Sequence, residues 1–97
     1  MNKFYVSQLI KKSKDLIKSR FDKFNIKVIE HIDDIEILSY QNELFQVILN
    51  LFSNSIDVLS SSQIENKIIY INIHKKDSLI FIITKINNII SINNYHH

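Results

Sequence analysis

The sequence predicts an α+β fold: a two-layer α/β sandwich with two helices packed on one face of a mixed sheet of about four strands. Two observations support this prediction. Apolar residues recur at helical spacing in residues 4–24 and 41–60. Alternating, β-branched runs fill residues 26–40 and 66–86. A chain of 97 residues buries about two thirds of its unfolded surface, so we expect residues 1–97 to form one domain with one core.

The first helix is predicted to extend through residue 24, because lysines that would face water separate its apolar residues. Residues 26–32 and 35–40 follow as strands, and the turn-prone pair Asp33 and Asp34 indicates a short hairpin or two neighbouring strands. The apolar residues that predict the first helix are Phe4, Val6, Leu9, Ile10, Leu16, Ile17, Phe21 and Phe24.

A second helix is predicted over residues 41–60, where an apolar stripe continues until the polar run at 60–63 breaks the pattern. Residues 66–76 and 78–86 are strand-like, and Asp77 between them favours a hairpin. We expect the core to contain Leu44, Val47, Ile48, Leu51, Phe52, Ile69, Ile71, Ile73, Ile80 and Ile82.

The composition excludes several classes of site. The chain has no glycine, so it has neither a Walker-type loop nor a GxGxxG turn, both of which bring backbone close to phosphate through glycine. It has no cysteine, which excludes disulfides and thiolate metal sites. No run approaches the roughly 18 apolar residues of a membrane span, and the N-terminus lacks a signal-peptide core. We therefore expect a soluble, cytoplasmic segment without membrane contact.

The charge is unevenly distributed. Residues 1–27 contain eight Lys or Arg against Asp15 and Asp22, a net +6, whereas the remainder contains four against eight, a net −4. Such a basic segment is typical of the solvated face of an amphipathic helix. The alternative is a small α+β module that binds nucleic acid or an acidic protein through its basic first helix.

The second predicted helix carries a polar stripe beside its apolar one. Its positions advance by three or four residues, so the side chains share one side of the helix. We expect the asparagines at the border of the core, half-buried, where an amide needs partners. Carboxamide oxygens are hard ligands that suit magnesium, although the stripe is also compatible with the plain polar edge of an amphipathic helix. The polar stripe consists of Glu43, Gln46, Asn50, Asn54 and Asp57.

The residues of this helix, E-x-x-Q-V-I-L-N-L-F-S-N-S-I-D-V-L, resemble the N box of sensor histidine kinases, in which a helix carries N-L-x-x-N-A-hydrophobic. The element order also resembles the first half of the ATP-binding domain shared by histidine kinases, gyrase-type ATPases and related chaperones. The resemblance covers about residues 4–84, so the predicted sandwich is a fragment of that domain. It implies ATP and Mg²⁺ as ligands, and a response regulator as partner of the full-length parent.

The resemblance also assigns roles to single residues. It implies that Asn54 is the magnesium ligand and that Asn50 lies near the nucleotide phosphates. Asp57 resembles the aspartate in the N-A-hydrophobic-D-A variant of the box. Gln46 stands where the gyrase-type branch has a glutamate that activates water, as in kinases that transfer phosphate to histidine. Glu43, one turn away, is a weak substitute for that glutamate.

The sequence departs from the family after residue 84. The family places D-x-G-x-G there, with an aspartate for the adenine amino group; residues 85–91 contain neither acid nor glycine. The lid and the phospho-acceptor histidine of the family are not matched either. We therefore expect weak or lost ATP binding, an isolated chain without kinase activity, and a divergent tail over 85–97. A gene fragment, a frameshifted copy or a deliberately shortened chain would each fit.

Three further expectations remain open. Lys85 could add positive charge beside Asn54, which is expected to face a shallow groove. The uncharged runs at 68–73 and 79–84 could form an exposed strand edge and promote self-association. His31 and His74 do not have the spacing of an acid-base or metal site, whereas the pair His96 and His97 could chelate a metal weakly.

Overall fold

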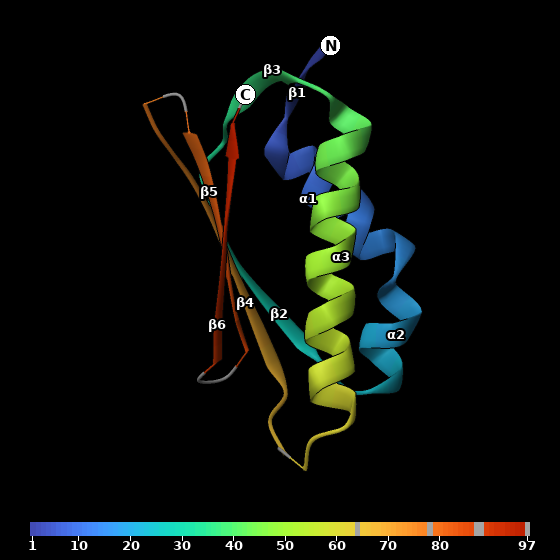
Figure 1. The fold of residues 1–97 in the computed structure, drawn as a ribbon. Helices are drawn as coiled ribbons and strands as arrows, with labels where there is room; N and C mark the ends of the chain where they lie inside the picture. Colours follow the sequence, from blue (N-terminus) through green and yellow to red (C-terminus); the bar gives the residue numbers. More distant parts are fainter. Residues whose placement is uncertain (64, 78, 87–88, 97) are drawn as a thin grey trace.

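The computed structural model describes residues 1–63, 65–77 and 79–86 with their side chains, and the backbone of residues 89–96. Figure 1 shows the helices and strands in space. Along the chain they are β1 (Asn2–Tyr5), α1 (Val6–Leu16), α2 (Lys18–Lys23), β2 (Lys27–Ile32), β3 (Glu36–Ser39), α3 (Gln41–Ser60), β4 (Ile68–Lys76), β5 (Leu79–Ile86) and β6 (Ile89–His96).

The main sheet has four strands in the order β2-β4-β5-β6, and β1 and β3 form a separate two-stranded sheet. β2 runs parallel to β4, whereas β4, β5 and β6 are successively antiparallel, so the main sheet is mixed. All three helices lie on the same side of this sheet (Figure 1). The predicted α+β sandwich, with helices packed on one face of a mixed sheet, is therefore confirmed.

The core lies between α3 and the helix-facing side of the sheet. Side chains along β4 and β5 are alternately buried and partly exposed, as expected for a sheet that is covered on one face. Phe52 is fully buried in α3, and its ring meets that of Phe21 edge to face at 5.6 Å. Nine of the ten predicted core residues are buried, and Val47 is partly buried against the same cluster.

The predicted first helix is shorter than expected and is broken. Phe4 lies in β1, where it is buried and pairs with Ile37 of β3, so strand pairing overrides the helical spacing. The helix is interrupted at Ile17, whose φ of −112° and ψ of 18° are not helical. The break leaves Leu16 exposed and lets Phe21 of α2 pack on α3.

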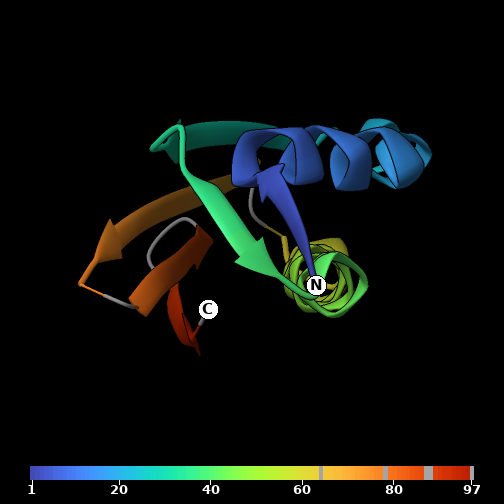
Figure 2. The same cartoon turned by 90° about the horizontal axis from the view of Figure 1, so that it is seen from above.

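The prediction of a hairpin or neighbouring strands for residues 26–32 and 35–40 is wrong, because β2 and β3 belong to different sheets. The aspartates between them do not form a tight turn. The Asp33 N–H donates to the Ile73 carbonyl and so continues the pairing of β2, while the Val6 N–H donates to the Ile35 carbonyl. Residues 33–35 thus turn from the end of β2 toward the start of α1. β3 then runs from there to the start of α3 (Figure 2).

The predicted β4–β5 hairpin is confirmed, with Lys76 paired to Leu79 and Ile69 to Ile86. Asp77 supplies the left-handed conformation at the turn, with φ of 57°; Ser78 lies outside the described residues. Both strands are interior to the sheet. The expectation that 68–73 or 79–84 forms an exposed strand edge is therefore wrong. Among the described residues, no helix is long and apolar enough to cross a membrane.

We expect Phe52→Ala to lower the free energy of unfolding by about 3–5 kcal/mol, because it empties a fully buried position and removes the contact with Phe21. Urea denaturation followed by circular dichroism measures the change. Val58→Ala is the matched control on the same helix, since Val58 is 44% exposed, and should change stability by no more than about 0.5 kcal/mol. Equal losses in the two variants would show that α3 does not pack as described.

Candidate functional site

The polar stripe lies on the solvent side of α3. The helix begins after Tyr40, whose carbonyl accepts a bond from the Leu44 N–H, and its buried positions take up the face turned to the sheet. The asparagines were expected to be half-buried at the border of the core; instead Asn50 and Asn54 are exposed, because α1 packs on a different side of α3 and leaves theirs open. The other residues of the polar stripe are also exposed; they are Glu43, Gln46 and Asp57.

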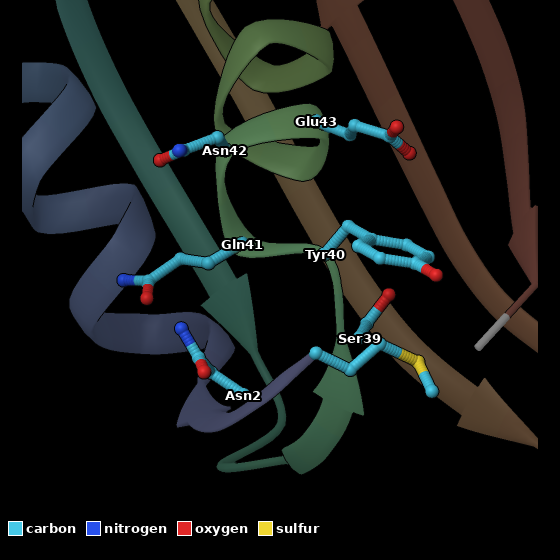
Figure 3. Close-up of a pocket in the computed structure, with 7 residues that line it drawn as sticks. Asn2, Ser39, Tyr40, Gln41, Asn42 and Glu43 are labelled. Carbon is cyan, nitrogen blue, oxygen red and sulfur yellow. The ribbon is translucent and has the colours of Figure 1, made fainter.

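Figure 3 shows which way the first turn of α3 points. Asn42 extends toward α1, whereas Glu43 extends to the opposite side, toward the strands β5 and β6. Asn50 and Asn54 follow Glu43 by seven and eleven positions, so helical periodicity places them on that same side. The two asparagines therefore point away from α1, into the open side of α3.

An apolar flank accompanies Asn54. Leu51, three positions before it, is buried, and Val58, four positions after it, is 44% exposed. Residues three and four apart are neighbours on a helix surface. Within the described part of the chain, no side chain bonds the amides of Gln46, Asn50 or Asn54. The carboxamide oxygens are hard donors with free lone pairs, so their chemistry fits a magnesium ion that keeps most of its water.

Asp57 differs from the asparagines because it already has a partner. Its Oδ1 lies 2.8 Å from the Arg20 guanidinium, and the two side chains are 68% and 39% exposed. The ion pair connects α2 to α3 and compensates part of the carboxylate charge. Asp57 is therefore a weaker candidate than Asn54 for a cation ligand.

Lys85 does not lie beside Asn54. Along β5 the side chains at even positions, such as Thr84, are buried toward the helices, and those at odd positions turn to the other face of the sheet. The Lys85 Nζ lies 5.9 Å from the centre of the Tyr70 ring on that far face. The expectation that Lys85 adds charge to the asparagine site is therefore wrong.

A hollow of about 310 Å³ opens at the first turn of α3 (Figure 3). Glu43 is the only residue of the polar stripe that lines it, so the hollow does not extend to Asn50 or Asn54. The other lining residues are Met1, Asn2, Ser39, Tyr40, Gln41 and Asn42.

Three of the six cations of α1 and α2 are held in ion pairs. Lys14 bonds Glu30 at 2.7 Å, Lys18 bonds Asp22 at 3.0 Å, and Arg20 is held by Asp57. Each pair neutralises one cation locally. Lys11, Lys12 and Lys23 are exposed and have no carboxylate partner among the described residues, so α1 and α2 keep part of their positive charge for a polyanion.

The two histidines whose side chains are described, His31 and His74, do not form a site together. His31 is exposed on β2, and His74 stacks on Phe81 with ring centres 5.1 Å apart. The residues that the structure describes include no group of three His, Asp or Glu able to hold a metal ion. The side chains of His96 and His97 lie outside the described residues.

Comparison with known proteins gives a consistent result for the fold. No family model and no curated protein matches the sequence. Among solved structures, the nucleotide-free catalytic domain of histidine kinase ThkA superposes with a TM-score of 0.75 at 21% identity, over 90% of this chain and 58% of that one. A mycobacterial sensor histidine kinase, MprB, gives 0.72 at 10% identity, over 90% and 55%. The Acinetobacter baumannii histidine kinase AdeS gives 0.70 at 12%, over 87% and 41%.

The chain therefore has the fold of histidine kinase catalytic domains and spans less than 60% of the ThkA domain's length. The fold implied by the N-box residues and the element order is confirmed. One of the similar structures is ThkA in complex with a response regulator, TrrA, which matches with a TM-score of 0.73 at 22% identity over 86% of this chain and 24% of that one.

We expect Asn50→Ala and Asn54→Ala each to raise the free energy of unfolding by about 0.5 kcal/mol, because both residues are exposed in a helix interior where alanine is preferred. Urea denaturation measures the change, with Ser55→Ala as the contrasting case. Ser55 is buried and bonds the Leu51 carbonyl at 2.8 Å, so its loss should not stabilise the fold. A loss of stability on removing either asparagine would mean that its amide has a structural role.

The Arg20–Asp57 pair should have a coupling energy of about 0.2–1 kcal/mol, as is usual for partly exposed ion pairs. A double-mutant cycle of Arg20→Gln and Asp57→Asn measures it, and salt at about 1 M should reduce it. A coupling energy of zero at low salt would remove this link between α2 and α3.

Proposed function

We propose that this chain is part of an ATP-binding domain of histidine-kinase type and carries its magnesium and phosphate side. The observation that supports this most strongly is the combination of fold and helix. The fold matches the ThkA catalytic domain over 90% of the chain, and within it α3 turns to the open side two asparagines whose amides bond no other described side chain.

In this proposal Asn54 supplies a carboxamide oxygen to Mg²⁺, which takes the rest of its shell from water and from nucleotide phosphate. Asn50, one turn earlier on the same side of α3, hydrogen-bonds phosphate through its N–H₂ group. Bound Mg²⁺ would neutralise phosphate charge. The chain's own residues orient the phosphates against the open side of α3, where Leu51 and Val58 flank Asn54.

Gln46 fits phosphate transfer better than ATP hydrolysis. A glutamine cannot remove a proton from water, so the stripe has no general base at the position one turn before Asn50. Glu43 is one turn further away and faces the hollow at the first turn of α3. The described residues thus bind and orient phosphate but place no general base at the Gln46 position, and the other carboxylate of α3, Asp57, is paired with Arg20.

The adenine side of the site is weak. β5 ends with Lys85, which turns away from α3, and Ile86, which is buried among apolar side chains. Neither side chain can accept a hydrogen bond from an adenine amino group, and Asn87 and Asn88, which follow, lie outside the described residues. An unmade buried hydrogen bond and a site open to water each lower the affinity. We therefore infer that this chain binds nucleotide weakly and does not phosphorylate a substrate by itself.

The parent protein of such a domain would be a cytoplasmic transmitter of a two-component system, with a response regulator as its partner. The support for this is a similar solved structure, histidine kinase ThkA bound to the response regulator TrrA.

We expect Mg²⁺-ATP to bind with a dissociation constant of about 1 mM or weaker, about 4 kcal/mol, because only magnesium and phosphate contacts are available. Titration followed by amide NMR shifts measures this, and the shifts should concentrate on the Asn50–Asn54 turn of α3. Asn54→Ala should abolish them. Asn42→Ala is the matched control, because Asn42 is an exposed asparagine of the same helix that points toward α1 (Figure 3).

Two results would contradict the proposal. Micromolar affinity that survives Asn54→Ala would place the nucleotide elsewhere. Complete absence of binding by the unaltered chain, at nucleotide concentrations well above 10 mM, would leave the likeness to kinases as one of fold only.

A further inference from the structure

The face of the main sheet opposite the helices carries a chemistry that the proposed kinase site does not use. The side chains along β4 and β5 that alternate with the buried ones point to this face, which we call the outer face. No described element covers it (Figures 1 and 2). The part of the outer face that matters below consists of Tyr70, His74, Lys76, Phe81, Ile83 and Lys85.

Two ring groups lie on the outer face. The Lys85 ammonium sits 5.9 Å from the centre of the Tyr70 ring, directly across the β4–β5 pairing. Further along β4, His74 pairs with Phe81 of β5. Their rings stack, with centres 5.1 Å apart and planes 11° from parallel. Tyr70 and His74 are four residues apart on β4, about 13 Å. The sheet thus presents two partly exposed aromatic platforms side by side.

The charge of the outer face is of one sign. Lys27 of β2, Lys76 of β4 and Lys85 of β5 all lie at outward positions, and no acidic residue lies at an outward position within these three strands, although Asp33 follows directly after β2. The one acid of β2, Glu30, turns to the other side, where it bonds Lys14 of α1. These outward lysines have no carboxylate partner among the described residues, unlike Lys14, Lys18 and Arg20 of the helices.

We propose that the outer face binds single-stranded nucleic acid. Bases stack on Tyr70 and on the His74–Phe81 pair, while Lys76 and Lys85 contact the phosphates. Aromatic rings combined with a cationic surface are the features by which strand-binding proteins hold unpaired bases without sequence preference. This inference does not rest on the proposed nucleotide site, which lies on α3, on the other side of the main sheet.

Two other occupants fit the face less well. A second copy of the chain would oppose lysine to lysine across a two-fold axis, and like charges brought together disfavour such a contact. An acidic peptide would satisfy the lysines but would leave the flat rings without stacking partners. Only a polyanion with planar groups uses both features.

The test is fluorescence anisotropy with a labelled oligothymidylate of about 12 nucleotides, within the site sizes of roughly 4–16 nucleotides known for strand-binding folds. Tyr70→Ile and Phe81→Ile remove one ring each but keep an apolar, strand-favouring side chain, so the sheet should stay intact. Each should weaken binding about tenfold. Lys85→Gln should weaken binding and reduce the slope of log K against log salt by about 0.7. Lys11→Gln, on the exposed side of α1, is the control and should change neither quantity.

Four outcomes would overturn the proposal. The first two are an absence of binding and isoleucine variants that bind as tightly as the unaltered chain. The third is a weakening by Lys11→Gln as large as by Lys85→Gln, which would place binding on α1, and the fourth is competition by polyglutamate as strong as by unlabelled oligonucleotide, which would indicate an acidic protein partner. Circular dichroism verifies that each variant is folded. Asn54→Ala should leave oligonucleotide affinity unchanged, which separates this proposal from the kinase site.

Discussion

The parallel pairing of β2 with β4 is the constraint on which the rest of the structure depends. Parallel neighbours cannot be joined by a tight turn, so the chain between them must cross one face of the sheet. Here the crossing is made by α3, which therefore buries one side on β4 and β5. The same pairing leaves the other side of α3 to carry the asparagines and leaves the outer face of the sheet without a helix.

The sequence is informative wherever a long regular period decides the structure. The apolar stripe of α3 and the alternation along β4 and β5 predict element type, boundaries and nearly all of the core, because burial on one side imposes that period. The sequence is uninformative where pairing with a distant segment decides the structure of a residue. Phe4 fits a helical spacing but pairs with Ile37, and β2 and β3 separate because their partners are β4 and β1.

The same distinction applies to the candidate site. Spacing alone predicts that the polar stripe shares one side of α3. It cannot predict the depth of the asparagines, which depends on where α1 packs, nor the partner of Asp57, which lies 37 positions away at Arg20. The face on which Lys85 lies can be predicted from the alternation along β5, in which Thr84 and Ile86 take the buried side.

The topology also has a consequence for the order of folding. The strands β4, β5 and β6 follow one another through short connections, so their pairing closes only small loops. β2 reaches β4 only after β3 and α3 have been placed, and forming so distant a contact requires the entropy of a long loop to be lost first. We therefore expect the three-strand meander to form early and the docking of β2 and of the α3 layer to complete the fold. Until then, the helix-facing isoleucines of β4 and β5 are exposed to solvent and to other chains.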